Sequence, residues 1–174
     1  LKKTYLKSKK IFVLSSSIKQ QFVGLGFPDE LLKIIPNGIQ IPFPLKEKIF
    51  NTDRPLKIVY FSFINEGKGS DIFIQIAKWA ESNKKKWEFG LIGGMSESDS
   101  SKWKDQIDSI DCLKYFGEIK NDKIQLLSQF DLMIFPSRLL EGQPLSILEA
   151  MMAGLPILAS RTGAIPDLIT PSVN

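Results

Sequence analysis

Short apolar runs alternate with amphipathic segments along most of this chain. Mostly apolar runs predict buried strands at residues 56–63, 89–92, 113–116, 132–135 and 155–159. Between them, apolar residues recur with one-face helical spacing, which predicts helices over residues 71–82, 101–110, 121–130 and 144–153, with a further helix starting at Ala164. Strands without polar alternation, each followed by a helix, are typical of a parallel sheet covered on both faces. We therefore expect an α/β fold with a doubly wound, Rossmann-like parallel sheet.

The first fifty residues have a less regular pattern. A short apolar strand is expected at residues 11–14, followed by a helix that Ser15-Ser16-Ser17 can cap and that runs to about Leu25. Ile34 and Ile35 predict a second short strand, which the turn 36–38 closes. Three prolines and mixed charges at residues 40–55 indicate a linker, so we expect a domain boundary near residue 50.

The composition excludes several kinds of catalytic and metal-binding site. The 174 residues include one cysteine and no histidine. This chain alone therefore cannot form a Ser-His-Asp triad, a Cys-His pair, a histidine-bound metal site or a cysteine-rich zinc site. No apolar run approaches the roughly 18–20 residues of a membrane span.

The positive charge is concentrated near the start of the chain. The net charge is +4, and residues 1–50 hold nine lysines against three acidic residues. These lysines form either a solvated helix face or a contact with an anionic surface such as membrane lipid. They are not interleaved with a repeated aromatic pattern, which argues against a nucleic-acid partner.

The loop after residue 135 carries the most chemical information. A helix starting near Pro144 directs free N–H groups and partial positive charge at this loop, an arrangement suited to a phosphate. Gly142 lets a ligand approach the backbone closely. Glu149 lies about 7.5 Å further along the helix, where a carboxylate can accept hydrogen bonds from both ribose hydroxyls. Glu141 precedes the helix, where a sugar on that phosphate would lie; alternatively, Glu141 only complements the helix dipole and Glu149 only faces solvent.

Two other loops at the same expected sheet edge are rich in glycine. Lys68 stands between Gly67 and Gly69, where it can meet an anion, although a solvated turn lysine is the alternative. The order of residues is not that of a Walker A loop. Gly93-Gly94 indicates either a close approach of backbone to a ligand or a tight turn. We identify no metal site, because the aspartates at 105, 108 and 111 are expected to face solvent.

Taken in order, these segments resemble the retaining glycosyltransferases of group 1, also called family 4, which have the GT-B fold. The resemblance covers nearly the whole chain. It rests on residues 35–39 (IPNGI), 67–69 (GKG), 91–94 (LIGG), 116–117 (FG), 131–137 (DLMIFPS), 141–149 (the two-glutamate motif) and 162–167 (TGAIPD).

The resemblance implies two Rossmann-like domains, the second of which binds a nucleotide-sugar donor. Residues 1–45 would be the tail of the acceptor-side domain with the hinge. Residues 46–174 would be most of the donor-binding domain, ending before its final helices, so this segment alone is expected to be inactive.

The resemblance also implies a role for each site residue. Lys68 and Glu141 would be catalytic: Lys68 would neutralise the leaving diphosphate, and Glu141 would bind donor-sugar hydroxyls. The donor would also be bound by Glu149, at the ribose, by Gly69 and by the segment Gly142, Gln143, Pro144 and Leu145. No metal and no cofactor besides the donor are expected, and the anomeric configuration would be retained.

One position departs from the family pattern. Phe63 stands where the family often has an arginine, which leaves the diphosphate one cation short. Arg138 is the expected replacement. The departure also motivates an alternative function, a non-catalytic nucleotide-sugar-binding or scaffold module.

The expected partners follow from the same resemblance. They are a nucleotide sugar and a glycan or lipid-linked acceptor, in polysaccharide or glycolipid biosynthesis on the cytoplasmic side of a membrane. The basic N-terminal segment would then contact the membrane periphery. A GT-B nucleotide-sugar epimerase is a further alternative.

Overall fold

The computed structural model describes residues 7–40 and 53–170. Contacts divide the described chain into two compact units. Of the described residues, the first unit contains 7–39, 139–145 and 161–170, and the second contains 40, 53–138 and 146–160. The boundary expected near residue 50 falls within residues 41–52, outside the described residues.

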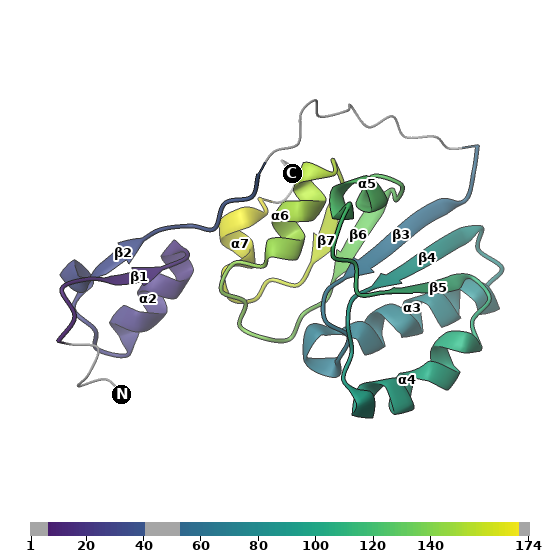
Figure 1. Ribbon diagram of the computed structural model, residues 1–174, viewed down its shortest axis with the longest axis horizontal. Helices are drawn as coiled ribbons and strands as arrows, with labels where there is room; N and C mark the ends of the chain where they lie inside the picture. Colours follow the sequence, from purple (N-terminus) through teal and green to yellow (C-terminus); the bar gives the residue numbers. More distant parts are fainter. Residues whose placement is uncertain (1–6, 41–52, 171–174) are drawn as a thin grey trace. The chain divides into compact units, whose positions relative to one another are not determined.

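The second unit is built on a parallel sheet, as its apolar runs predict. Its strands are β3 (Leu56–Phe61), β4 (Trp87–Ile92), β5 (Leu113–Gly117), β6 (Leu132–Phe135) and β7 (Ile157–Ala159). Their spatial order is β5-β4-β3-β6-β7, and each neighbouring pair runs parallel (Figure 1). The chain moves outward from β3 to β5 and then returns to place β6 beside β3. The strand order therefore reverses between β3 and β6, which confirms the doubly wound fold.

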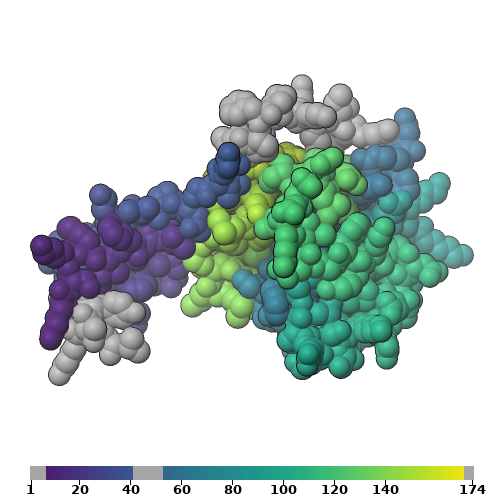
Figure 2. All heavy atoms as spheres, in the orientation of Figure 1, coloured from purple at the N-terminus to yellow at the C-terminus, as the bar shows by residue number. Residues whose placement is uncertain are grey.

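Helices cover both faces of this sheet. The helices α3 (Ser70–Ser82) and α4 (Glu97–Asp108) lie on one face, and α5 (Lys123–Leu127) and α6 (Leu145–Met152) lie on the other (Figure 1). Ile58 and Tyr60 belong to a buried cluster with residues of α3 and α4, while the intervening Val59 and Phe61 are buried on the opposite face. The teal and green atoms of this unit pack without a visible gap (Figure 2).

The first unit combines three separate stretches of chain. The strands β1 (Ile11–Val13) and β2 (Leu32–Ile34) pair in parallel, with α2 (Ser16–Gly24) following β1 and the short α7 (Ile165–Leu168) coming from the far end of the chain. The Asp167 carboxylate accepts hydrogen bonds from the Ser17 backbone N–H and hydroxyl at 2.9 and 2.8 Å. These two bonds join α2 to α7 across 150 positions of sequence.

Several expected elements have different bounds in the structure. The strand expected at Ile34-Ile35 begins two residues earlier, at Leu32. The helix expected at 101–110 begins at Glu97, because the Ser96 hydroxyl accepts the Asp99 N–H and caps a polar first turn. The helix expected at 121–130 is shorter, since Asp122 has a left-handed φ of 56° and helical structure starts after it.

Among residues 7–40 and 53–170, no helix combines the length and the apolar character that a membrane crossing requires.

Candidate functional site

The loop after β3 forms around Lys68. The Asn65 side chain accepts a hydrogen bond from the Lys68 N–H at 2.8 Å, which closes a 3-10 turn over Glu66–Lys68. The next residue, Gly69, has a φ of 77°, and a Cβ there would lie 2.1 Å from the Pro136 carbonyl oxygen. Only glycine fits this position, because both the dihedral angle and the space exclude a side chain. The Lys68 loop therefore packs directly on the loop that follows β6.

Arg138 fastens these two loops together. Its backbone N–H donates to the Gly67 carbonyl at 2.8 Å, and its guanidinium donates to both Asp71 carboxylate oxygens at 2.7 and 2.8 Å. A further guanidinium hydrogen bond reaches the Glu66 carbonyl. Hydrogen bonds from Arg138 lower the pKa of Asp71, with burial acting in the opposite direction. The expected use of Arg138 as a diphosphate cation stays a prediction, and in this structure its charge is matched by Asp71.

Glu149 lies in the second turn of α6, with 18% of its side chain exposed. Its Oε1 accepts a hydrogen bond from the Lys123 ammonium group at 3.1 Å. The same ammonium nitrogen lies 5.9 Å from the centre of the Phe61 ring, at the carboxyl end of β3. The sequence analysis did not identify Lys123. The sequence pointed to Lys123 only indirectly: it follows β5, and the loops after parallel strands are expected to meet at one edge of the sheet.

Glu141 belongs to the first unit and is buried, with 6% exposed. Its carbonyl accepts the Ala164 N–H at 2.8 Å. Gly163 has a φ of 57°, and a Cβ there would come within 2.3 Å of the Glu141 carbonyl oxygen. The segment 162–167, which was singled out from sequence, therefore supports the backbone of Glu141.

Gln143 is held by the turn at residues 36–38. The Asn37 backbone N–H donates to the Gln143 side-chain oxygen, and the Asn37 side chain donates to the Gln143 carbonyl at 3.0 Å. Two motifs that are 106 positions apart thus meet within the first unit. Sequence reasoning named both motifs but did not predict this pairing.

The remaining predicted residues lie around the start of α6. Gly142 is half-buried, Pro144 is buried, and Leu145 is half-exposed and begins the helix one residue after the predicted start. The predicted set divides between the units. Lys68, Gly69, Arg138 and Glu149 belong to the second unit, and the segment 141–145 belongs to the first.

Close backbone approach also marks the loops after β4 and β5. Gly93 has a φ of 151°, and a Cβ there would lie 1.8 Å from the Ser62 carbonyl oxygen. Its N–H donates to Gly117 at 2.9 Å, and Ile64 donates to Gly94 at 2.8 Å. Three loops are thereby joined at the carboxyl edge of the sheet. Phe63, beside them, is 47% exposed.

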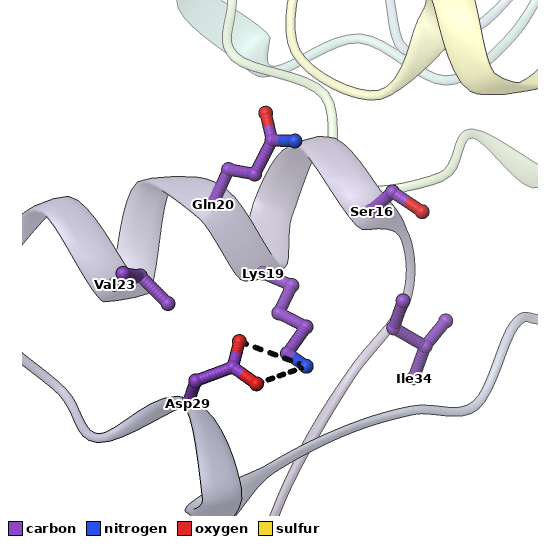
Figure 3. Close-up of a pocket in the computed structure, with 6 residues that line it drawn as sticks. All are labelled: Ser16, Lys19, Gln20, Val23, Asp29 and Ile34. Atoms are coloured by element: carbon purple, nitrogen blue, oxygen red, sulfur yellow. Dashed lines mark hydrogen bonds and ion pairs between the residues drawn. The ribbon is translucent and has the colours of Figure 1, made fainter.

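A cavity of about 320 Å³ lies in the first unit, and none of the predicted residues lines it. Figure 3 shows the Lys19 ammonium group reaching both Asp29 oxygens across it. The lining residues are Ser16, Lys19, Gln20, Val23, Asp29 and Ile34. Within the described part of the chain, no three His, Cys, Asp or Glu side chains gather as a metal site would need.

A doubly wound parallel sheet with this strand order is one half of the GT-B fold. The family model for glycosyl transferases group 1 matches residues 55–174, and the chain belongs to that family.

Its relatives extend beyond this chain. The amylovoran biosynthesis glycosyltransferase AmsK of Erwinia amylovora is 25% identical over 98% of this chain and 44% of its own length. HepE of Anabaena, solved with UDP and glucose, superposes with a TM-score of 0.78 at 24% identity, over 96% of this chain and 48% of HepE. TarM of S. aureus superposes at 0.76 with 23% identity, over 97% of this chain and 33% of TarM. The chain thus spans about half the length of the first relatives it matches.

Proposed function

We propose that this chain carries the donor-binding part of a glycosyltransferase, which transfers a sugar from a nucleoside-diphosphate sugar with retention of configuration. The observation that carries the proposal is the meeting of two loops at the strand-order reversal between β3 and β6. There the Lys68 loop packs on the loop after β6, which leads into the start of α6. Ligands of open α/β sheets bind at such a reversal, outside the carboxyl ends of the strands.

The chemistry of the residues supports a diphosphate ligand. Lys68 supplies a cation for the leaving diphosphate, and the backbone N–H groups of Gly142, Gln143 and Leu145 supply donors for phosphate and sugar oxygens. Glu141 accepts hydrogen bonds from donor-sugar hydroxyls, and Glu149 accepts them from the ribose. The relative HepE, which was solved with UDP and glucose, supports a nucleotide sugar as donor.

Binding of the donor is the first test. We expect calorimetric titration of the intact protein with UDP, GDP and ADP sugars to find one binder, and Glu149→Ala to weaken it about tenfold. Glu88→Ala is the matched control, because Glu88 is 54% exposed at the opposite edge of the same sheet. If no nucleoside diphosphate binds at millimolar concentration, the proposal fails.

The proposal extends to a glycan or lipid-linked acceptor in polysaccharide or glycolipid assembly, as with the amylovoran relative. It also includes peripheral membrane contact through the basic N-terminal segment on the cytoplasmic face. In the proposed reaction Lys68 and backbone donors stabilise the leaving group. We therefore expect a chelator to leave the transfer rate unchanged, whereas a chelator-sensitive rate would require a metal-dependent scheme.

Phe63 favours a second candidate, a module that binds nucleotide sugars without turning them over. Its ring is half-exposed at the position where the family often carries a cation. Donor hydrolysis and transfer by the intact protein, compared with Glu141→Gln, separate the two functions. A large loss of rate in the variant indicates an enzyme, and equal rates indicate the binding module. An epimerase would be identified by a changed nucleotide sugar among the products of a reaction that contains no acceptor.

A further inference from the structure

Among the described residues, Lys123 is the ionic partner of Glu149, and the two come from different elements. Lys123 is the first residue of α5, and Glu149 lies in the second turn of α6. Their charged groups are 3.1 Å apart, with 36% and 18% of the side chains exposed. A half-buried carboxylate is stabilised by a nearby positive charge, and Lys123 supplies one.

The geometry leaves Glu149 able to bind a ligand. The hydrogen bond from Lys123 goes to Oε1, and an ionised carboxylate offers about four acceptor positions over its two oxygens. One ammonium contact therefore fixes the direction of the carboxylate without using all of its acceptor capacity. Phe61, whose ring centre is 5.9 Å from the ammonium nitrogen, also restricts where Lys123 can move.

We propose that Lys123 is a positioning residue for ribose recognition: it fixes the direction of the Glu149 carboxylate, and so sets the preference for ribose over 2′-deoxyribose nucleotides. This inference rests on the proposed function, in which Glu149 accepts hydrogen bonds from the ribose hydroxyls. A carboxylate held in one direction can accept both hydroxyls together, whereas a mobile one must first be ordered at an entropic cost. Replacing Lys123 should therefore reduce the affinity that the 2′-hydroxyl contributes more than the affinity that the phosphates contribute.

The test is calorimetric titration of the intact protein with three probes: UDP, 2′-deoxy-UDP and inorganic pyrophosphate. GDP and 2′-deoxy-GDP replace the uridine pair if UDP does not bind. In Lys123→Met we expect UDP affinity to fall about tenfold, 2′-deoxy-UDP affinity to fall much less, and pyrophosphate affinity to stay the same. Lys123→Arg should recover most of the loss, because it restores the cation.

Two further variants separate positioning from other roles. Lys123→Met in a Glu149→Ala background should have no additional effect, because Lys123 acts through that carboxylate. Lys120→Met is the matched control, since Lys120 is exposed three residues earlier in the chain. Equal thermal midpoints for both methionine variants exclude a loss of folding as the cause.

Two titration results would overturn the role proposed for Lys123. An equal loss for all three probes would make Lys123 a phosphate-binding cation, and no loss for any probe would remove it from the site. Either result overturns this inference while the proposed function stands, provided that wild-type protein binds nucleotide and Glu149→Ala weakens that binding. Wild-type protein that binds no nucleoside diphosphate overturns both.

Discussion

At the scale of single residues, the charge of Arg138, in the loop after β6, forms contacts that support the fold. From the sequence, Arg138 is predicted to bind the diphosphate, because it lies three residues before Glu141. In the structure both of its terminal nitrogens bind Asp71, and its backbone N–H binds the Lys68 loop. The geometry therefore makes Arg138 the support of the Lys68 loop.

Asp71→Asn tests this support. The substitution keeps the size of the side chain but removes one half of a charge-assisted, bidentate pair, so the Lys68 loop loosens. We expect the affinity for the nucleoside diphosphate to fall about fivefold by titration calorimetry. Asp105→Asn, on the exposed side of α4, is the control and should change nothing. A rise in affinity would mean that Arg138, once released, binds the phosphates.

The same pair predicts a pH dependence. Arg138 lowers the pKa of Asp71 below its ordinary value of 3.8, so the pair stabilises the folded state fully above pH 3.8. As the pH falls through the lowered folded-state pKa, Asp71 takes up a proton and that stabilisation is lost. Urea unfolding of wild type and Asp71→Asn should show a constant difference in stability down to about pH 5. The difference should shrink below pH 3.8, and a difference that persists at the lowest pH would contradict the assignment.

Pairs of this kind could not be predicted from the sequence. Lys123 and Glu149 are 26 positions apart, and Asp71 and Arg138 are 67 apart, so no local periodicity relates them. Sequence predicted the loops that would meet, because parallel strands end at one edge. It could not predict which side chain would pair with which.

At the scale of elements, the strands were the most predictable part. Each strand from β3 to β6 falls on a mostly apolar run, because a parallel strand covered on both faces leaves few positions for polar residues. The charged exceptions, Lys57, Glu88 and Lys114, are each the second residue of their strand. The predicted first residues of α4 and α5 were wrong. Ser96 sets the start of α4 by capping its first turn, and Asp122 sets the start of α5 through a left-handed dihedral angle. Such local geometry overrides the apolar periodicity that defined the expected helices.

Gly163→Ala tests the short connection that leads into α7. A Cβ at this position would meet the backbone of Glu141 at 2.3 and 2.4 Å, and the φ of 57° disfavours any side chain. Because Glu141 is proposed to bind the donor sugar, we expect the transfer rate to fall at least about tenfold. Binding of the sugar-free nucleoside diphosphate should change much less. Gly24→Ala, where a Cβ would meet nothing within 4 Å, is the control, and an unaltered rate in Gly163→Ala would show that the backbone adjusts.

At the scale of the molecule, one buried carboxylate joins the two central strands at their beginnings. Asp131 is 4% exposed, accepts two hydrogen bonds from Arg54 at 2.7 Å, and accepts the Lys57 N–H at 2.9 Å. It thereby connects the starts of β3 and β6 across more than seventy positions of sequence. We therefore expect the stability of the sheet in the second unit to depend on this contact.

Asp131→Asn should therefore lower the free energy of unfolding of the whole second unit. The amide cannot accept all three hydrogen bonds, so donors lose their partner at a cost of about 1–3 kcal/mol. Chemical denaturation measures the change, with the exposed Asp108→Asn as control. Equal midpoints for wild type and Asp131→Asn would mean that the sheet does not need this contact.

The make-up of the first unit has a consequence for engineering. Gln143 and Asp167 come from late in the chain, yet their partners, Asn37 and Ser17, lie before residue 40. A chimera that imports everything after residue 53 from a homologue, in order to change donor specificity, would separate both pairs. Successful exchanges should transplant residues 17 and 37 together with the incoming sequence, or leave 139–145 and 161–170 native and graft only the stretches between them.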